Sequence, residues 1–366
     1  MTKIINAKVG DDKYPIVIGL NIAQEFDAFL NLYSKESVFI VADLFFKKSN
    51  FLLVEKIKRY KCIFIDGGLE SKSFDSYQKL IKLLVQNKIP KDGVIVAIGG
   101  GVIGDLVAFV ANTYQRGIDL ILVPTTSTAM LDSSVGGKTG INYLNQVNLI
   151  GTYHNPKAIF MDIDFIKTLK SRDYYSGICE AIKMSITSDR MMFERLNSIY
   201  ENVSNRNLEI LEEIISWAVR IKLKHVSDDP KEKSLRLLLN YGHTFGQAIE
   251  SYYGLFQDIL RHGEAVSLGL IIAAKLSVLI NDNKLNPSII EKTKEILERY
   301  NLPTKLNQLK TNNIPTVETL LNNLNNDKKR LSKGNRFILC RDVGSPSVEF
   351  VKDKDKLFES FKSIYD

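Results

Sequence analysis

Two histidines and one glutamate are the residues of this chain best suited to bind a metal ion. His243 lies in NYGHTFGQAIE, His262 in RHGEAV and Glu180 in SGICEAIKMSI. Histidine is the commonest metal ligand near neutral pH, and two imidazoles with one carboxylate would leave a position on zinc open for a substrate hydroxyl or water. The three residues form no local motif, however. From their spacing alone, histidines that cap helices or form hydrogen bonds within a core remain the alternative.

A glycine-rich turn is the second feature suited to chemistry. VIVAIGGGVIGD, residues 94–105, places its glycines where a buried strand would turn into a helix. A backbone without Cβ atoms can approach a pyrophosphate closely, and the first turn of a helix offers free N–H groups to it. Gly99, Gly101 and Gly104 fit the dinucleotide pattern, and Asp43 ends an earlier strand, where an open α/β sheet binds its cofactor. These features favour nucleotide binding over a simple tight turn.

A polar segment follows the strand 118–123. PTTSTAMLDSSVGGKTGIN, residues 124–142, contains Thr125, Thr126, Asp132 and Lys138, and shows little apolar periodicity. It is longer than most connections between elements, and binding residues concentrate in loops at the ends of strands. The segment is therefore predicted to be functional rather than a solvated connection.

The elements that would position these residues change in kind along the chain. Short apolar runs at 38–42, 62–65, 94–98, 118–123 and 158–161 alternate with amphipathic segments such as 72–87, which predicts a parallel sheet with crossover helices. After about residue 171 helical patterns dominate, at 208–223, at 263–280 and between Pro287 and Pro303. The chain is expected to form an α/β Rossmann-like domain over residues 1–170, followed by an all-α domain over residues 171–366.

Composition narrows the class of protein. The 366 residues are 45% hydrophobic and 25% charged, as in globular proteins, and the apolar runs are far shorter than the ~20 residues of a membrane-spanning helix. Three cysteines are too few for a disulfide framework, and MTKIINAKVG lacks the apolar core of a signal peptide, so a cytoplasmic protein without a membrane partner is expected. The net charge of +7 is spread along the chain, which favours a small anionic substrate over nucleic acid.

Seven separated motifs together resemble one family. GGGVIGD, YQRG, PTT with LDSSVGGKTGIN, NLIG, EAIK, LLNYGHTFG and HGEAV are similar, in order and spacing, to the 3-dehydroquinate synthases among the sugar phosphate cyclases. The resemblance implies an NAD-binding α/β domain, an α-helical metal-binding domain and a homodimer. It also implies a lyase of the shikimate pathway that converts 3-deoxy-D-arabino-heptulosonate 7-phosphate to 3-dehydroquinate and phosphate. The steps would be transient oxidation by NAD, β-elimination of phosphate, re-reduction, ring opening and aldol closure.

The resemblance also implies roles for individual residues. Glu180, His243 and His262 would bind Zn²⁺ or Co²⁺. Positions that match cofactor contacts of the family are Asp43, Glu70, Lys72, Gly100, Gly101, Val102, Asp105, Thr125, Thr126, Asp132, Lys138, Phe165, Thr168 and Leu169. Positions that match its substrate and catalytic residues are Lys138, Lys183, Asp132, Asn148, Lys222, Arg236, Asn240, Arg116 and Lys328. Lys222 and Arg236 would hold the substrate carboxylate, and Arg116 would reach into the neighbouring subunit's site.

Two positions depart from the family pattern. The family usually has histidine where this chain has Gln247, and lysine where it has Val147. Glutamine cannot carry a positive charge or relay a proton, and valine removes a cation. The substrate therefore has alternatives: an amino analogue of the heptulosonate, or sedoheptulose 7-phosphate in a 2-epi-5-epi-valiolone synthase type of reaction. A metal-dependent polyol dehydrogenase and a non-catalytic relative are the more distant alternatives.

Overall fold

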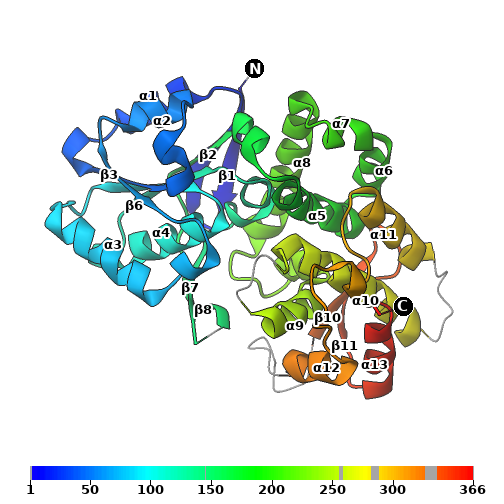
Figure 1. The fold of residues 1–366 in the computed structure, drawn as a ribbon. Helices are drawn as coiled ribbons and strands as arrows, with labels where there is room; N and C mark the ends of the chain where they lie inside the picture. The colour runs from blue at the N-terminus through cyan, green and yellow to red at the C-terminus, as the bar shows by residue number, and fades with distance from the viewer. Residues whose placement is uncertain (1, 145, 255–258, 282–287, 326–335, 366) are drawn as a thin grey trace. The chain divides into compact units, whose positions relative to one another are not determined.

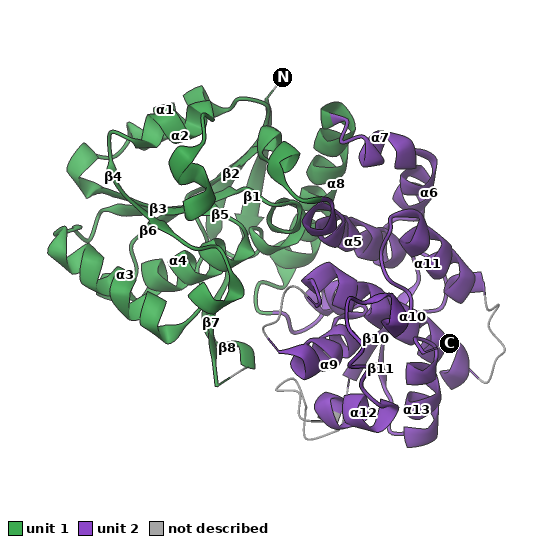
Figure 2. Cartoon of the chain, in the orientation of Figure 1, with its two compact units in different colours: residues 1–170, 208–231 green, residues 171–207, 232–366 purple. Residues whose placement is uncertain are grey.

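A computed structural model describes residues 2–144, 146–254, 259–281, 288–325 and 336–365 of the chain. It divides into two compact units (Figure 2). Unit 1 contains residues 1–170 and 208–231, and unit 2 contains residues 171–207 and 232–366. The segment 208–231, which the sequence predicted to belong to the second domain, groups with unit 1.

The core of unit 1 is a seven-stranded sheet with the order β1-β2-β9-β6-β5-β3-β4. All five apolar runs predicted to be strands are strands of this sheet, and they pair in parallel as predicted. Each has β-branched or aromatic residues and is bounded by polar or glycine-containing turns, which is why it is extended and buried. These strands are β3 (Val38–Asp43), β4 (Lys61–Ile65), β5 (Val94–Gly99), β6 (Asp119–Pro124) and β9 (Ala158–Asp162).

Two further strands extend the sheet at one edge. β1 (Lys3–Val9) and β2 (Asp12–Gly19) form an antiparallel hairpin, and β2 pairs in parallel with β9. Helix α8 (Leu208–Asp228) packs on this hairpin, with Lys3 Nζ 2.8 Å from Glu212 Oε1 and the Ser227 hydroxyl donating to the Lys8 carbonyl at 2.6 Å. These contacts explain why a helix from the middle of the chain belongs to unit 1.

Helices cover both faces of the sheet, with α1 and α2 on one side and α3 and α4 on the other (Figure 1). The predicted helix 72–87 corresponds to α3, which begins after Ser73, whose hydroxyl accepts a hydrogen bond from the Ser76 N–H. A side-chain oxygen in this position satisfies one of the free N–H groups of the first turn. The bounds are α1 (Ala23–Leu30), α2 (Leu52–Ile57), α3 (Phe74–Gln86) and α4 (Gly101–Thr113).

The polar segment predicted as a functional loop is largely ordered secondary structure. It begins with a helical turn, η5 (Ala129–Ser133), and continues into β7 (Lys138–Tyr143). β7 pairs antiparallel with β8 (Gln146–Tyr153), which forms a two-stranded ribbon separate from the main sheet. The ribbon holds Lys138 and Asn148 in fixed positions, which a solvated loop would not do.

Unit 2 is helical, as predicted, with one small hairpin that sequence analysis did not anticipate. Its central helix is α10 (His262–Ile280), against which α5, α9, α11 and α13 pack. α10 is long and apolar enough to span a membrane by composition, but 83% of its apolar window is buried inside the structure, as in the core helix of a globular unit. The other elements are α5 (Ser171–Ser188), α6 (Arg190–Ser198), α7 (Tyr200–Ser204), α9 (His243–Tyr253), α11 (Ser288–Arg299), α12 (Val317–Asn325), α13 (Lys354–Lys362), β10 (Arg336–Cys340) and β11 (Pro346–Phe350).

Glycines allow α9 and α10 to pack with their backbones almost in contact. A Cβ atom at Gly269 would lie 2.1 Å from the Gly242 carbonyl oxygen, and one at Gly246 would lie 2.9 Å from the Ala265 carbonyl oxygen. Real Cβ atoms do not approach backbone so closely, so a larger residue at either position must move one helix. Because α9 begins with His243 and α10 with His262, this packing also determines where the two histidines lie.

We predict that Gly269→Ala lowers the free energy of unfolding by about 1–3 kcal/mol, because the new methyl group meets backbone that cannot yield. Gly104→Ala is the matched control, since a Cβ at this helical glycine would have nothing within 4 Å. The control should change stability by no more than about 1 kcal/mol, in the stabilising direction that helix propensity gives. Urea denaturation of both variants measures this, and equal effects would contradict the close-packing account.

Candidate metal and cofactor sites

The three predicted metal ligands come from three helices of unit 2 and converge on one point. Glu180 lies in the middle of α5, and His243 and His262 are the first residues of α9 and α10. One potential ligand atom of each residue lies within 4.8 Å of the other two. Glu180 Oε1 is 3.7 Å from His243 Nε2 and 3.5 Å from His262 Nε2. The structure therefore brings together residues that are far apart in the sequence.

These separations fit a shared metal ion better than direct hydrogen bonds. An N–H···O hydrogen bond has a donor–acceptor distance of about 2.9 Å, whereas two ligands about 2.1 Å from one ion in tetrahedral geometry are about 3.4 Å apart. The donor set of two imidazoles and one carboxylate is common for catalytic zinc and is also suitable for other divalent transition metals. The residues present therefore fit the ion that the resemblance implies.

The other ring nitrogens of the two histidines also have partners. His262 Nδ1 lies 2.9 Å from Glu250 Oε1, and His243 Nδ1 lies 3.3 Å from the Tyr241 carbonyl oxygen. A metal-bound histidine typically hydrogen-bonds a carboxylate or carbonyl through its second nitrogen, which fixes the ring. Glu250 was not among the predicted site residues, although it lies seven residues after His243 and hence on the same face of α9.

The charge around His262 favours a cation. Partial burial lowers the pKa of its imidazole, but the carboxylates of Glu250 and Glu180 outweigh this and hold the pKa well above its usual value. In the metal-free protein this position therefore attracts a proton, and a divalent cation would satisfy the same two carboxylates.

Lys183 compensates the other oxygen of Glu180. Both side chains are buried, with exposed fractions of 1% and 0%, and the Lys183 ammonium donates to Glu180 Oε2. Oε1 is the oxygen that faces the two histidines. The ion pair thus orients the carboxylate, and it places the predicted catalytic Lys183 next to the metal ligands.

Two further predicted residues of unit 2, Arg236 and Asn240, lie between Glu232 and the start of α9. Arg236 is buried, with 2% of its surface exposed, and the Asn240 amide donates to the Glu232 carboxylate. Glu232 was not among the predicted site residues, and no sequence motif marks it. Lys328 lies outside the described residues.

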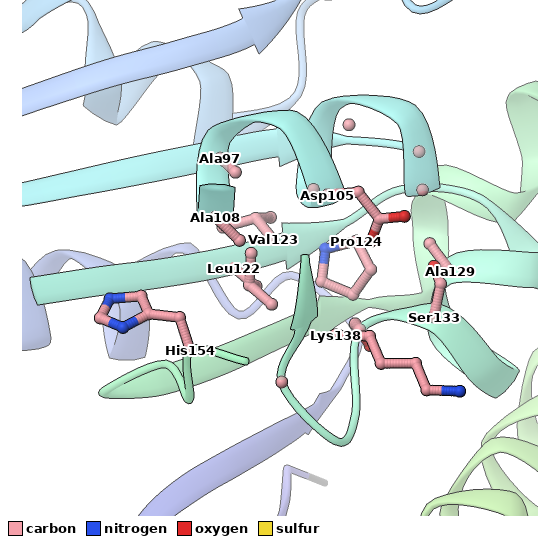
Figure 3. Close-up of a pocket in the computed structure, with 16 residues that line it drawn as sticks. Ala97, Asp105, Ala108, Leu122, Val123, Pro124, Ala129, Ser133, Lys138 and His154 are labelled. Atoms are coloured by element: carbon pink, nitrogen blue, oxygen red, sulfur yellow. The ribbon is translucent and has the colours of Figure 1, made fainter. Parts of the chain in front are cut away.

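In unit 1 the glycine-rich turn connects β5 to α4, as the dinucleotide pattern predicts. Gly100 precedes the first residue of α4, and Cβ atoms at Gly100 and Gly101 would lie 3.0 Å from the Thr126 and Ser133 side chains. The turn lines a pocket together with residues of β6, η5 and β7. Figure 3 shows Asp105, Ser133 and Lys138 around this pocket, with His154 at its other end.

A buried lysine joins several predicted cofactor and substrate residues. Lys72 is 4% exposed, and its ammonium binds Asp105 of α4 and the Asn148 side chain of β8. Its carbonyl accepts a hydrogen bond from the Asn142 N–H at 2.8 Å, and the Asn142 side chain in turn accepts from the Asn148 N–H at 3.0 Å. Lys72 therefore holds the ribbon β7–β8 against the start of α4.

Asp132 and Lys222 also form a pair within unit 1. Lys222 Nζ lies 2.8 Å from Asp132 Oδ1 and also donates to the Asp132 carbonyl. The pair connects α8 to the turn η5. Lys222 and Arg236, predicted to bind the same carboxylate, belong to different units.

The other predicted cofactor residues lie at or near strand ends. Asp43 ends β3, and its carboxylate accepts a hydrogen bond from the Phe45 N–H at 2.9 Å. The Phe165 side chain is fully buried against Phe46 and Phe51, so only its backbone is available to a ligand. Glu70 and Lys138 are exposed, Thr125 is buried, and Val102, Thr126, Thr168 and Leu169 are half-buried.

Arg116 lies at the surface in an unusual backbone conformation. Gln115 and Arg116 have φ values of 49° and 62°, in the left-handed region, and Gly117 follows with φ 106°. Consecutive non-glycine residues in this region are costly and persist where the surroundings require them, often at functional sites. Arg116 is exposed at this turn, which follows the end of α4.

We predict that Asp105→Asn destabilises unit 1 by about 3 kcal/mol, because it leaves the buried ammonium of Lys72 without its carboxylate. It should also weaken NAD binding, which isothermal titration measures. Asp164→Asn is the control, since Asp164 pairs with an exposed Lys167 at 2.7 Å and its loss should cost less than about 1 kcal/mol. Equal stabilities of the two variants would show that the Lys72 pair does not hold the site together.

Comparison with known proteins decides the family. Residues 62–176 match the sequence profile described as 3-dehydroquinate synthase N-terminal, and residues 177–330 match the one described as 3-dehydroquinate synthase C-terminal. The chain belongs to the 3-dehydroquinate synthase family. Among the relatives of this family, the 3-dehydroquinate synthase of Dictyoglomus thermophilum is 35% identical over 353 residues, 96% of each chain. That of Alkaliphilus oremlandii is 36% identical over 96% of this chain and 94% of its own.

Solved structures share the fold. A 2-epi-5-epi-valiolone synthase from Streptomyces hygroscopicus, solved with NAD⁺ and Zn²⁺, has a TM-score of 0.85 at 21% identity and covers 98% of both chains. A 2-deoxy-scyllo-inosose synthase, solved with carbaglucose-6-phosphate, NAD⁺ and Co²⁺, has a TM-score of 0.81 at 23% identity over 98% of this chain and 99% of its own. An NADH-dependent butanol dehydrogenase from Thermotoga maritima is less similar, with a TM-score of 0.69 at 13% identity over 100% and 98% of the chains. The α/β and helical architecture predicted from the sequence is confirmed.

Proposed function

We propose that this chain is a lyase that converts 3-deoxy-D-arabino-heptulosonate 7-phosphate to 3-dehydroquinate and phosphate, with NAD and a divalent metal ion as cofactors. The observation that carries the proposal is the convergence of Glu180, His243 and His262 in a chain of this family. Unit 1 would bind NAD through its glycine turn, and unit 2 would hold the metal ion. This division extends the predicted 1–170 domain by the segment 208–231.

The residues of the chain have distinct tasks in this reaction. When bound, NAD would supply hydride transfer and the metal ion would supply polarisation of a substrate alcohol and carbonyl. Glu180, His243 and His262 would hold the ion, with Glu250 fixing the ring of His262. We propose zinc as the ion, because two imidazoles and a carboxylate suit it. The start of α4 offers free N–H groups to the cofactor pyrophosphate.

The substrate carries a carboxylate and a phosphate, and the proposal assigns cationic and amide groups to each. Lys222 and Arg236 would bind the carboxylate. Both are buried, at 5% and 2% exposure, where a charged hydrogen bond discriminates strongly against an uncharged substrate. Lys138, Asn148, Asn240, Arg116 and Lys328 would surround the phosphate, and Lys183 would act beside the metal ion.

Gln247 and Val147 leave one specific alternative for the substrate. Gln247 lies on the face of α9 between His243 and Glu250, and Val147 lies in β8 next to Asn148, with 38% of its surface exposed. Neither can supply a positive charge. The alternative is a related cyclase reaction, with an amino analogue of the heptulosonate or with sedoheptulose 7-phosphate as the substrate.

We predict that the purified chain with NAD and Zn²⁺ releases phosphate from 3-deoxy-D-arabino-heptulosonate 7-phosphate, and that no NADH accumulates because each hydride returns to the substrate. Sedoheptulose 7-phosphate, offered in parallel, should release none. His262→Ala should lose metal and turnover together, because a site with only two protein ligands binds the ion far less tightly. Phosphate from sedoheptulose 7-phosphate alone would support the alternative substrate, and net NADH formation would indicate a polyol dehydrogenase.

The proposal includes a homodimer in which Arg116 completes the partner's phosphate site. β8 is exposed along almost its whole length and presents apolar side chains, among them Val147, Leu149 and Tyr153. Asn112, near the end of α4, donates to Thr152 of β8 at 2.7 Å, so this exposed strand lies beside the helix end that precedes the turn with Arg116. A second copy of the chain is the occupant that would bury it, since a two-fold interface pairs a surface with itself.

Mixing two inactive variants tests this. Arg116→Ala and Lys138→Ala chains, unfolded and refolded together, would form mixed dimers with one intact site if Arg116 acts across the interface. Activity should then recover to about a quarter of the wild-type value, because half of the dimers are mixed and each has one intact site. Absence of recovery, with dimers present by light scattering, would place Arg116 in its own subunit's site.

Location in the cytoplasm stays a prediction of the sequence.

A further inference from the structure

The first turn of α10 is attached to α5 at two points beyond the metal ligands. Both oxygens of the Glu264 carboxylate accept hydrogen bonds from the Arg172 guanidinium. Nε donates to Oε1 at 2.5 Å, and Nη2 donates to Oε2 at 2.6 Å. The Gly263 N–H donates to the Ser176 hydroxyl at 2.8 Å. Glu264 Oε2 also accepts a hydrogen bond from the Arg261 N–H at 2.8 Å, so the same carboxylate caps the N-terminus of α10. None of these contacts involves Glu180 or His262 directly.

The spacing of these contacts follows the helix repeat. Arg172, Ser176 and Glu180 are four residues apart on α5 and therefore lie along one face. Their counterparts on α10 are Glu264, Gly263 and His262, in the opposite order along the chain. The two helices therefore meet at three successive positions: a bidentate ion pair, a hydrogen bond and the proposed metal site.

The two helices also touch too closely to slide. A Cβ atom at Gly263 would lie 2.0 Å from the Ser176 carbonyl oxygen and 2.6 Å from its Cα. The Glu264 side chain is 10% exposed, so its ion pair is largely shielded from water. Because the planar guanidinium of Arg172 binds both oxygens of Glu264, it fixes the orientation of the carboxylate as well as its distance.

We infer that four positioning residues set the distance between His262 and Glu180 at which both side chains can bind one metal ion. These residues, here called the α5–α10 clasp, are Arg172, Ser176, Gly263 and Glu264. The inference rests on the proposed metal site and adds residues to it that touch neither metal nor substrate. Without the clasp, the first turn of α10 can shift, and a shift of about 1 Å is enough to spoil a coordination geometry.

Metal affinity is the direct test. Zn²⁺ affinity is measured by chelator competition, and the visible absorption of the Co²⁺-loaded protein reports the ligand geometry. Arg172→Met should weaken metal binding about 10–100-fold and alter the Co²⁺ spectrum, Ser176→Ala should weaken binding about tenfold, and Arg172→Lys should recover part of the loss. Glu264→Gln combined with Arg172→Met should lose little more than Arg172→Met alone, because the two residues act as one pair.

The control is Arg190→Met. Arg172 combines its ion pair with a hydrogen bond from Nη2 to the Ile259 carbonyl at 2.6 Å. Arg190 of unit 2 likewise combines an ion pair, to Asp342 at 2.5 Å, with a hydrogen bond to the Val343 carbonyl, but it lies outside the clasp. It should leave metal affinity and the Co²⁺ spectrum unchanged. Thermal unfolding of the metal-free proteins separates loss of fold from loss of metal, and if Arg172→Met does not fold, Ser176→Ala decides alone.

The outcomes distinguish this inference from the proposed function. Clasp variants that bind metal within about threefold of the wild type, with the same Co²⁺ spectrum, would overturn the clasp and leave the metal site intact. Losses equal to that of Arg190→Met would overturn it as well. A wild-type chain that binds no divalent metal would instead overturn the metal site of the proposed function.

Discussion

The carboxylate of Glu180 is fully buried in unit 2, and a buried anion is stable only beside positive charge. Lys183 supplies one charge to Oε2, three residues along the same helix. Oε1 faces His243 and His262 at distances too long for good hydrogen bonds and suitable for a shared cation. The need to compensate this carboxylate is the constraint around which the helices of unit 2 are arranged. It also explains why glycines occur where α9 and α10 pack against each other and where α10 meets α5.

Unit 1 contains a buried cation, the ammonium of Lys72, which also needs a partner of opposite charge. The ammonium of Lys72 is held by Asp105 and Asn148, which belong to α4 and to the ribbon β7–β8. The ion pair therefore links the glycine turn, where the cofactor pyrophosphate is proposed to bind, to the strand that carries Asn148. In both units, a buried charged group joins side chains from different elements.

Much of this fold could be predicted from the sequence, because each parallel strand is a short β-branched run and each long helix has a clear apolar face. The edge hairpin β1–β2 and the ribbon β7–β8 were not predicted, since their alternation is weak and their pairing depends on contacts with α8 and α4. The position of α8 in unit 1 also could not be predicted, because it follows from partners such as Lys3 and Lys8, some 200 residues away. Glu180, His243 and His262 were metal candidates from residue type alone, but only the family resemblance favoured them over histidines that cap helices or form hydrogen bonds within a core. Glu250 could have been found from its spacing, since it lies seven residues after His243 on α9. No motif marked Glu232 or the clasp residues, and their contacts depend on tertiary packing.

The central claim is that Glu180, His243 and His262 hold one metal ion. X-ray absorption spectroscopy of the Zn²⁺-loaded chain, with the metal content measured on the same sample, tests it most directly. The account predicts one ion per chain, bound by two imidazole nitrogens and oxygen ligands at about 2.0–2.2 Å, with no sulfur ligand. A sulfur shell, a single imidazole, or a chain that retains no ion would contradict it.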